Sequence, residues 1–136
     1  MKFMCLVYND DAALEAMPEA EFWAFSNAHV AVDEELKRSG HSLVAEALQP
    51  ARTARTVRVR GGKTHVTDGP YAEAKELVGG IYLIEARDME EATAIAARIP
   101  SASVTGIEVR PVWELRQQAP RTGRSRSRHG EKVTKA

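Results

Sequence analysis

The sequence predicts a single α+β domain in which an antiparallel sheet is covered by helices. Three observations support this prediction: strand-like segments alternate with two helical segments, two strands are apolar on both faces, and a two-glycine hairpin interrupts the alternation. The chain has 136 residues, 43% of them hydrophobic and 28% charged, as one globular domain would. Wholesale disorder is excluded.

The first strand and the first helix have clear signatures. Residues 1–8, MKFMCLVY, are apolar in both alternating sets, which predicts a strand covered on both faces. After an acidic loop, a helix should begin at Pro18 and end at Ser39, with Gly40 as its left-handed cap. A spacing of three and four residues places one apolar stripe on this helix: Phe22, Phe25, His29, Val32 and Leu36.

A hairpin is expected in the middle of the chain. A short strand at 42–48 is followed by two arms at 56–60 and 63–67, which flank Gly61-Gly62, a pair typical of tight hairpin turns. In the first arm Val57 and Val59 alternate with arginines, so one face of the hairpin should meet water.

The remaining elements repeat the first half. Residues 81–85, IYLIE, form a second strand that is apolar on both faces. Asp88, with Glu91 three residues later, predicts a capping box and a helix that Pro100 stops. This helix should bury Ala92, Ile95, Ala96 and Ile99. A last strand is expected at 105–113.

The order β-α-β-(hairpin)-β-α-β, with right-handed crossovers, gives a ferredoxin-like antiparallel sheet with two helices on one face and an extra β-hairpin insert. The second apolar face of the two strands still needs a cover. A second copy of the sheet is the simplest one, which predicts a homodimer with an enclosed space between sheets and helices.

The zero net charge divides unevenly along the chain. Residues 116–136 hold seven basic residues and one acidic residue, so this stretch carries +6 and the domain at 1–115 carries −6. The basic stretch has almost no large apolar side chain and is expected to be a disordered tail. It could touch nucleic acid weakly or remain a solvated extension; nucleic acid is otherwise not expected as a partner.

Cysteine content and hydropathy indicate a cytoplasmic protein without a membrane span. Cys5 is the single cysteine, which excludes an intrachain disulfide framework and a zinc ribbon. No apolar run approaches the roughly 20 residues that a membrane span needs. Neither a nucleotide-binding glycine motif nor a metal-ligand spacing is present, so no cofactor and no metal are expected.

The folded part resembles the YCII-related proteins, in particular their DGPF-type branch. The most specific element is Asp68-Gly69-Pro70-Tyr71, followed by Glu73, Lys75 and Glu76. The segments EALQP at 46–50 and EVRPV at 108–112 support the resemblance, which spans residues 2–115. Tyr71 stands where the branch has Phe, and Ala74 where Thr is usual.

The resemblance implies a ferredoxin-like domain that dimerises sheet to sheet into a dimeric α+β barrel. It implies less about activity, because most members of the branch have no assigned reaction. The wider group includes a dehydrochlorinase in which a histidine of the first helix is proposed to act with an aspartate, and His29 is the matching position. Genes of this branch are often found beside genes for extracytoplasmic-function sigma factors, so the resemblance also implies a link to transcriptional regulation.

The candidate catalytic residues are His29 and Asp68, and each has a structural alternative. An imidazole in an apolar stripe suits acid–base chemistry, but it could equally be a core histidine with one hydrogen bond. Asp68 could orient that imidazole, or it could serve only to form a turn with the glycine and proline that follow. The candidate substrate-binding residues are Gly69, Pro70, Tyr71 and Lys75, although Lys75 could simply pair with its acidic neighbours.

Two functions remain open from the sequence. The first is a cofactor-independent enzyme of the lyase or isomerase kind that uses a His29–Asp68 pair on a small carboxylate or lactone. The second is a non-catalytic metabolite-binding or regulatory module linked to sigma-factor-controlled transcription.

Overall fold

A computed structural model describes residues 1–115, and the expectation of a disordered basic tail falls outside these residues. The elements follow in this order: β1 (Lys2–Asn9), α1 (Asp11–Ala16), α2 (Glu19–Arg38), β2 (Ser42–Ala47), β3 (Arg55–Arg60), β4 (Lys63–Asp68), β5 (Leu77–Glu85), α3 (Met89–Ala96) and β6 (Gly106–Pro111). Two short 3₁₀ turns are η1 (Ala51–Thr53) and η2 (Pro100–Ser103).

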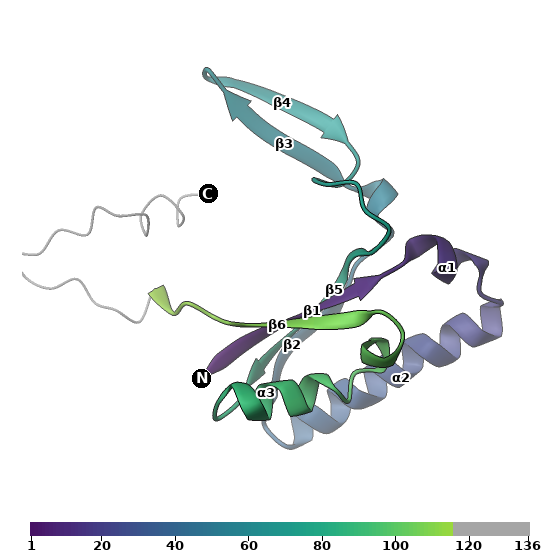
Figure 1. Ribbon diagram of the computed structural model, residues 1–136, viewed down its shortest axis with the longest axis vertical. Helices are drawn as coiled ribbons and strands as arrows, with labels where there is room; N and C mark the ends of the chain where they lie inside the picture. Colours follow the sequence, from purple (N-terminus) through teal and green to yellow (C-terminus); the bar gives the residue numbers. More distant parts are fainter. Residues whose placement is uncertain (116–136) are drawn as a thin grey trace, which may run out of the picture.

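The main sheet has the strand order β2-β5-β1-β6, and every neighbouring pair is antiparallel. Helices α2 and α3 lie on the same face of this sheet (Figure 1). The order of the strands is that of the ferredoxin-like fold, so the predicted α+β architecture is confirmed. The predicted hairpin is also present, as a separate sheet of β3 and β4 that projects away from the main sheet (Figure 1).

The core lies between this sheet and the two helices. Alternate residues of β1 and β5 are buried in it, among them Phe3, Cys5 and Ile84. Ala92, Ile95 and Ala96 of α3 are buried with them, as is Leu36 of α2. Ile99 is buried too, but it lies beyond the helix, which ends at Ala96 and not at Pro100 as predicted. The apolar side chains between the buried strand residues point to the opposite face and stay partly exposed: Met4, Leu6, Ile81 and Leu83.

The helix ends follow the predicted chemistry, with one correction. Helix α2 starts after Pro18 and ends at Arg38, with Ser39 as its C-cap. Gly40 takes a φ of 82°, which a residue without a Cβ adopts at little cost. Asp88 caps α3 by accepting a hydrogen bond from the Glu91 amide at 2.9 Å. The predicted acidic loop after β1 is wrong, since it contains helix α1.

Helix α1 begins where an aspartate can cap it. The Asp10 carboxylate accepts a hydrogen bond from the Ala13 amide at 3.2 Å, and Asp11 adds a negative charge to the first turn. Both interactions stabilise the start of a short helix.

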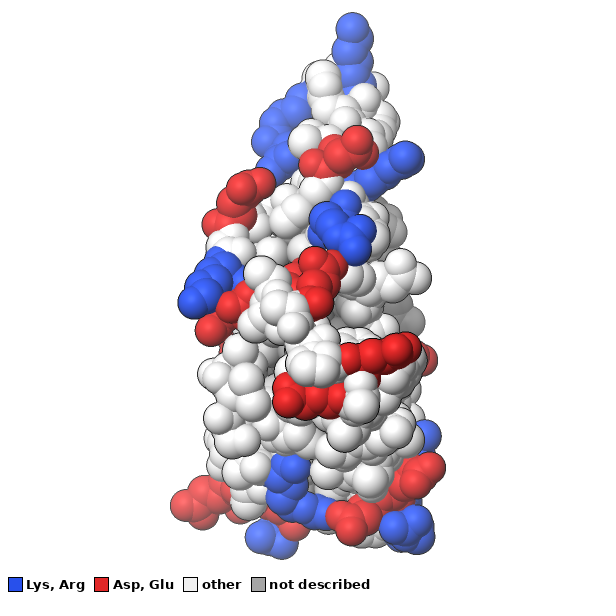
Figure 2. Space-filling view, turned by 90° about the vertical axis from the view of Figure 1, so that its right-hand side faces the viewer, with Lys and Arg blue, Asp and Glu red and all other residues white. Residues whose placement is uncertain are grey.

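The β3–β4 hairpin carries different chemistry on its two faces. Gly61 and Gly62 have φ values of 56° and 78°, as the expected two-glycine turn requires. Val57 pairs with Val66 on one exposed face, while Arg58 pairs with His65 on the other. In Figure 2, Lys and Arg side chains gather toward the end of the molecule where Figure 1 places this hairpin.

Candidate functional site

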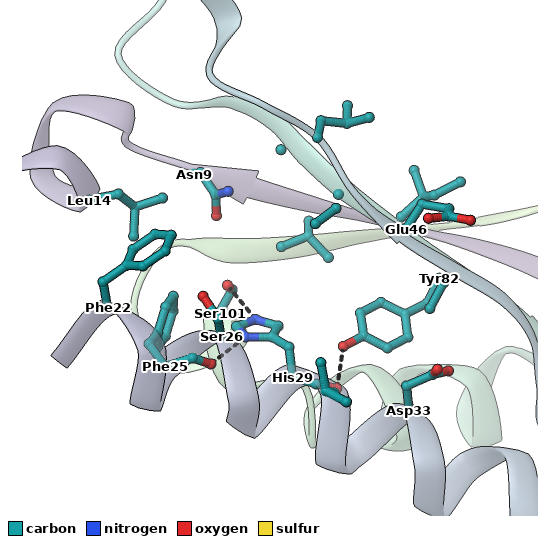
Figure 3. A pocket seen from close by; sticks show the side chains of 18 residues that line it. Asn9, Leu14, Phe22, Phe25, Ser26, His29, Asp33, Glu46, Tyr82 and Ser101 are labelled. Atoms are coloured by element: carbon teal, nitrogen blue, oxygen red, sulfur yellow. Dashed lines mark hydrogen bonds between the residues drawn. The ribbon is translucent and has the colours of Figure 1, made fainter. Parts of the chain in front are cut away.

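A cavity of about 300 Å³ lies between the first half of α2 and the adjoining ends of β1, β2 and β5 (Figure 3). This volume is at the lower end of the range for small-molecule sites. Apolar residues form most of its wall: Val7, Leu14, Phe22, Phe25, Val30, Ala45, Ala47, Leu48 and Ile81. The remaining lining residues are Asn9, Ser26, His29, Asp33, Glu46, Gly79, Gly80, Tyr82 and Ser101.

His29 lines this cavity, and its hydrogen bonds determine its tautomer. The Nδ1 atom lies 2.9 Å from the carbonyl oxygen of Phe25, one turn earlier in α2. A carbonyl oxygen can only accept, so Nδ1 must carry the proton. In the neutral ring Nε2 is then an acceptor, and the Ser101 hydroxyl, 2.9 Å away, donates to it (Figure 3).

Ser101 is a residue of the candidate site that the sequence did not reveal. It is only 1% exposed, and it follows Pro100 in the turn η2. Its own carbonyl accepts hydrogen bonds from the amides of Val104 and Thr105, at 3.1 and 2.9 Å, which hold the turn in place. Because 72 residues separate Ser101 from His29, only the fold brings them together.

Tyr82 attaches the same part of α2 to the sheet. Its hydroxyl donates to the backbone carbonyl of His29 at 3.0 Å (Figure 3). Burial, and after it the nearby Asp33 carboxylate, raises the pKa of Tyr82 to about 12. The phenol therefore stays protonated, and remains a donor, at neutral pH.

The Asn9 side chain lies against Gly79 of β5, which has no Cβ to displace it. A Cβ at Gly79 would lie 2.1 Å from the Asn9 Nδ2 atom, so a side chain there would displace the amide. Among the described residues, neither the Asn9 amide nor the Ser26 hydroxyl has a hydrogen-bond partner. Both groups are available to a ligand.

The other predicted site residues lie elsewhere in the chain. None of Asp68, Gly69, Pro70, Tyr71 and Lys75 lines the cavity. The Asp68 carboxylate ends β4, is 91% exposed and lies 3.4 Å from the Arg55 guanidinium. The Lys75 ammonium lies 3.9 Å from the Asp10 carboxylate, and the Tyr71 ring packs under the Arg58 guanidinium at 4.9 Å.

The turn after β4 has its own internal contacts. The Gly69 amide donates to the Ala54 carbonyl at 2.8 Å, and the Gly69 carbonyl accepts from the Thr56 hydroxyl at 2.9 Å. Gly69 has a φ of 109°, a conformation that favours glycine. Within one chain, the structure therefore does not bring Asp68 to His29.

Within residues 1–115, no group of three or more His, Cys, Asp or Glu side chains is arranged to hold a metal ion. No helix of that region is long and apolar enough to cross a membrane.

Comparison with known proteins identifies the family. The chain is 33% identical over 114 residues to the uncharacterised protein R00369 of Rhizobium meliloti strain 1021, covering 82% of this chain and 92% of that protein. A solved structure of 5-chloro-2-hydroxyhydroquinone dehydrochlorinase from Burkholderia phenoliruptrix AC1100, in complex with 2,5-dihydroxybenzoquinone, is similar at 16% identity. It matches 92% of this chain and all of the dehydrochlorinase chain, with a TM-score of 0.48. The DGPF branch stays a prediction, but the YCII-related domain matches residues 1–116, and this chain therefore belongs to the YCII-related family.

Proposed function

We propose that the cavity binds a small organic molecule and that His29 acts there as a general base in a cofactor-independent reaction of the lyase or isomerase kind. The observation behind this proposal is the fixed tautomer of His29, which keeps a lone pair on Nε2 at the cavity wall. An imidazole in that state can accept a proton from a bound carbon or oxygen acid.

The hydrogen bonds around His29 define how the proton would move. The Ser101 hydroxyl occupies Nε2, so it either rotates away or hands its own proton to Nε2 while it takes one from the ligand. In both cases the imidazolium keeps its Nδ1–H bond to the Phe25 carbonyl, which stabilises the new positive charge. The Phe25 carbonyl already accepts from Nδ1, the nitrogen to which an orienting carboxylate such as that of Asp68 would bind. A role for Asp68 therefore stays a prediction.

The second candidate function is a binding or regulatory module without catalysis. Both ring nitrogens of His29 are already hydrogen-bonded within the chain, as in a histidine that only supports a wall. In that case the cavity would sense a metabolite, and the link to sigma-factor-controlled transcription belongs with this alternative.

We propose further that the protein is a homodimer and that it acts in the cytoplasm. The side chains of Met4, Leu6, Ile81 and Leu83 form an apolar face of the sheet opposite the helices, and a second copy of this face would cover them. Light scattering at micromolar concentration tests the dimer, and a monomeric mass would refute it. The single thiol, Cys5, is buried and unpaired, which fits a reducing compartment.

The test of catalysis follows exchange of ligand protons for deuterium. Ligands found by a thermal-shift screen of lactones and small ring compounds would be incubated with the protein in D₂O, and the loss of their acidic C–H signals followed by proton NMR. We expect His29→Ala to slow this exchange at least 100-fold while the ligand still binds. Asp68→Asn tests the predicted partner, and His65→Ala, on the exposed hairpin, is the matched control.

The outcomes separate the two functions. If His29→Ala binds ligand normally and exchange is unchanged, catalysis by His29 is refuted and the binding module stands. If no compound of the screen raises the melting temperature or exchanges, both functions fail.

A further inference from the structure

The charges around the cavity are all of one sign. Of the described residues that line it, two are carboxylates, Asp33 and Glu46, and none is a lysine or an arginine. Asp33 is already compensated, because it accepts a hydrogen bond from Ser42 and lies 3.2 Å from the Lys37 ammonium. Glu46 is exposed and pairs with Ile81 of β5, so its side chain points to the sheet face away from the helices. No unpaired charge and no cation of the described residues therefore faces the cavity.

The cation expected at the site is engaged elsewhere. Lys75 was predicted to bind an anionic substrate, but its ammonium is 81% exposed, faces Asp10 and does not line the cavity. An anion in the cavity would lose water without gaining a counter-charge. Burial of an unpaired charge is among the most unfavourable changes that a binding site can impose.

The free polar groups of the cavity are uncharged. The Asn9 amide offers two N–H donors and a carbonyl acceptor, and the Ser26 hydroxyl offers one donor and two lone pairs. Neither is used within the described residues, whereas His29, Ser101 and Tyr82 hydrogen-bond within the protein. Figure 3 shows Asn9 on the strand side of the cavity and Ser26 on the helix side, next to the rings of Phe22 and Phe25.

We infer that the cavity selects uncharged ring compounds with hydrogen-bonding substituents over carboxylate anions, and that Asn9 and Ser26 are the residues that recognise those substituents. This inference rests on the proposed ligand-binding function. Of the two ligands that the sequence predicted, a small carboxylate or a lactone, it favours the lactone and excludes the carboxylate. The apolar wall and Phe25 bind the ring, and the two polar groups set its orientation.

The test compares two probes of the same shape, benzamide and benzoate. Each is titrated into ¹⁵N-labelled full-length protein at pH 7.5 up to about 20 mM, and backbone and Asn side-chain shifts are followed by NMR. We expect benzamide to shift the Asn9 side-chain amide and the backbone signals of Ser26 and His29, with at least tenfold higher affinity than benzoate.

Two variants test the recognising amide directly. Asn9→Ala removes it, and Gly79→Ala displaces it with a methyl group, so each should weaken benzamide at least fivefold. Asn27→Ala is the matched control, since Asn27 lies on the same helix as His29 but is exposed and outside the cavity. Its affinity for benzamide should be unchanged.

Each result decides the inference. Equal or tighter binding of benzoate at the cavity overturns the charge selection while leaving the proposed ligand-binding function intact. Full benzamide affinity in both Asn9→Ala and Gly79→Ala overturns the role of Asn9. If neither probe shifts a cavity signal at 20 mM, the inference is refuted, and the ligand screen decides separately whether the proposed function fails too.

Discussion

The hydrogen bond between Ser101 and His29 can be measured by a double-mutant cycle. Ser101→Ala deletes the hydroxyl, His29→Leu deletes the acceptor, and the double variant lacks both. A neutral hydrogen bond contributes about 1 kcal/mol net, and a buried group that loses its partner costs about 1–3 kcal/mol. His29 is half-buried and faces a cavity that water can enter, so the lower part of this range applies.

We therefore expect Ser101→Ala to lower the free energy of unfolding by about 1 kcal/mol. For a domain of this size, that loss corresponds to a fall of ~4 °C in the melting temperature. In His29→Leu the serine has no acceptor to lose, so the same change should cost much less there. The difference, a coupling energy of about 1 kcal/mol, reports the bond itself.

Urea unfolding followed by circular dichroism gives these free energies, with all variants at one protein concentration because a dimer would make stability concentration-dependent. Ser103→Ala is the matched control: it deletes an exposed hydroxyl on the same turn that bonds only to the Pro100 carbonyl. A coupling energy below about 0.3 kcal/mol, within the usual additivity of independent sites, would show that the bond is absent in solution. The argument for a fixed Nε2 acceptor would then fail with it.

Three further predictions concern groups with shifted pKa values. Burial raises the pKa of the Cys5 thiol to about 11, so a thiol reagent at pH 8 should label it only on unfolding, and rapid labelling of the native protein would contradict the burial. The pKa of Tyr82 is about 12 in the folded protein against a usual 10, so its contribution to the free energy of unfolding is complete below pH 10 and is lost between pH 10 and 12. Tyr82→Phe should lower the free energy of unfolding by about 1 kcal/mol at pH 7. Denaturant unfolding of this variant between pH 10 and 12 should depend less on pH than that of the unchanged protein. The Arg110 guanidinium and then the Tyr8 hydroxyl hold the pKa of Glu108 below its usual 4.5, so Glu108 stabilises the folded protein above that pH and loses this effect as the pH falls further. In Glu108→Gln the melting temperature should therefore fall less steeply with decreasing pH. An equally steep fall in this variant would contradict the prediction.

The elements that the sequence predicted are those with periodic patterns. The three- and four-residue spacing along α2 and the two-sided apolar strands determine the sheet order and the helical face without knowledge of any long-range contact. Helix α1 was missed because six residues are too few for a period, and its signal is one capping bond from Asp10. The strand predicted at 81–85 begins earlier in the structure, because β5 starts at Leu77 and includes Gly79 and Gly80.

The site was only half predictable for a related reason. Placement in an apolar stripe marked His29, since a titratable group among core positions is unusual wherever it occurs. Its partner Ser101 lies on a 3₁₀ turn with no pattern of its own, and Asn9 depends on a glycine of a neighbouring strand. Short motifs, by contrast, drew attention to Asp68 and Lys75, whose contacts in the single chain are with Arg55 and Asp10.

The apolar stripe of α2 changes its role along the helix. At its C-terminal end Leu36 is fully buried in the core, whereas Phe22, Phe25 and His29 at the N-terminal end line a cavity. The helix is held beside that cavity by two hydrogen bonds, from Tyr82 to the His29 carbonyl and from Ser101 to its ring. Directional bonds can maintain a gap that close packing would fill, because they fix a separation without occupying the space. The residues that make this site stable are therefore the ones that keep it open.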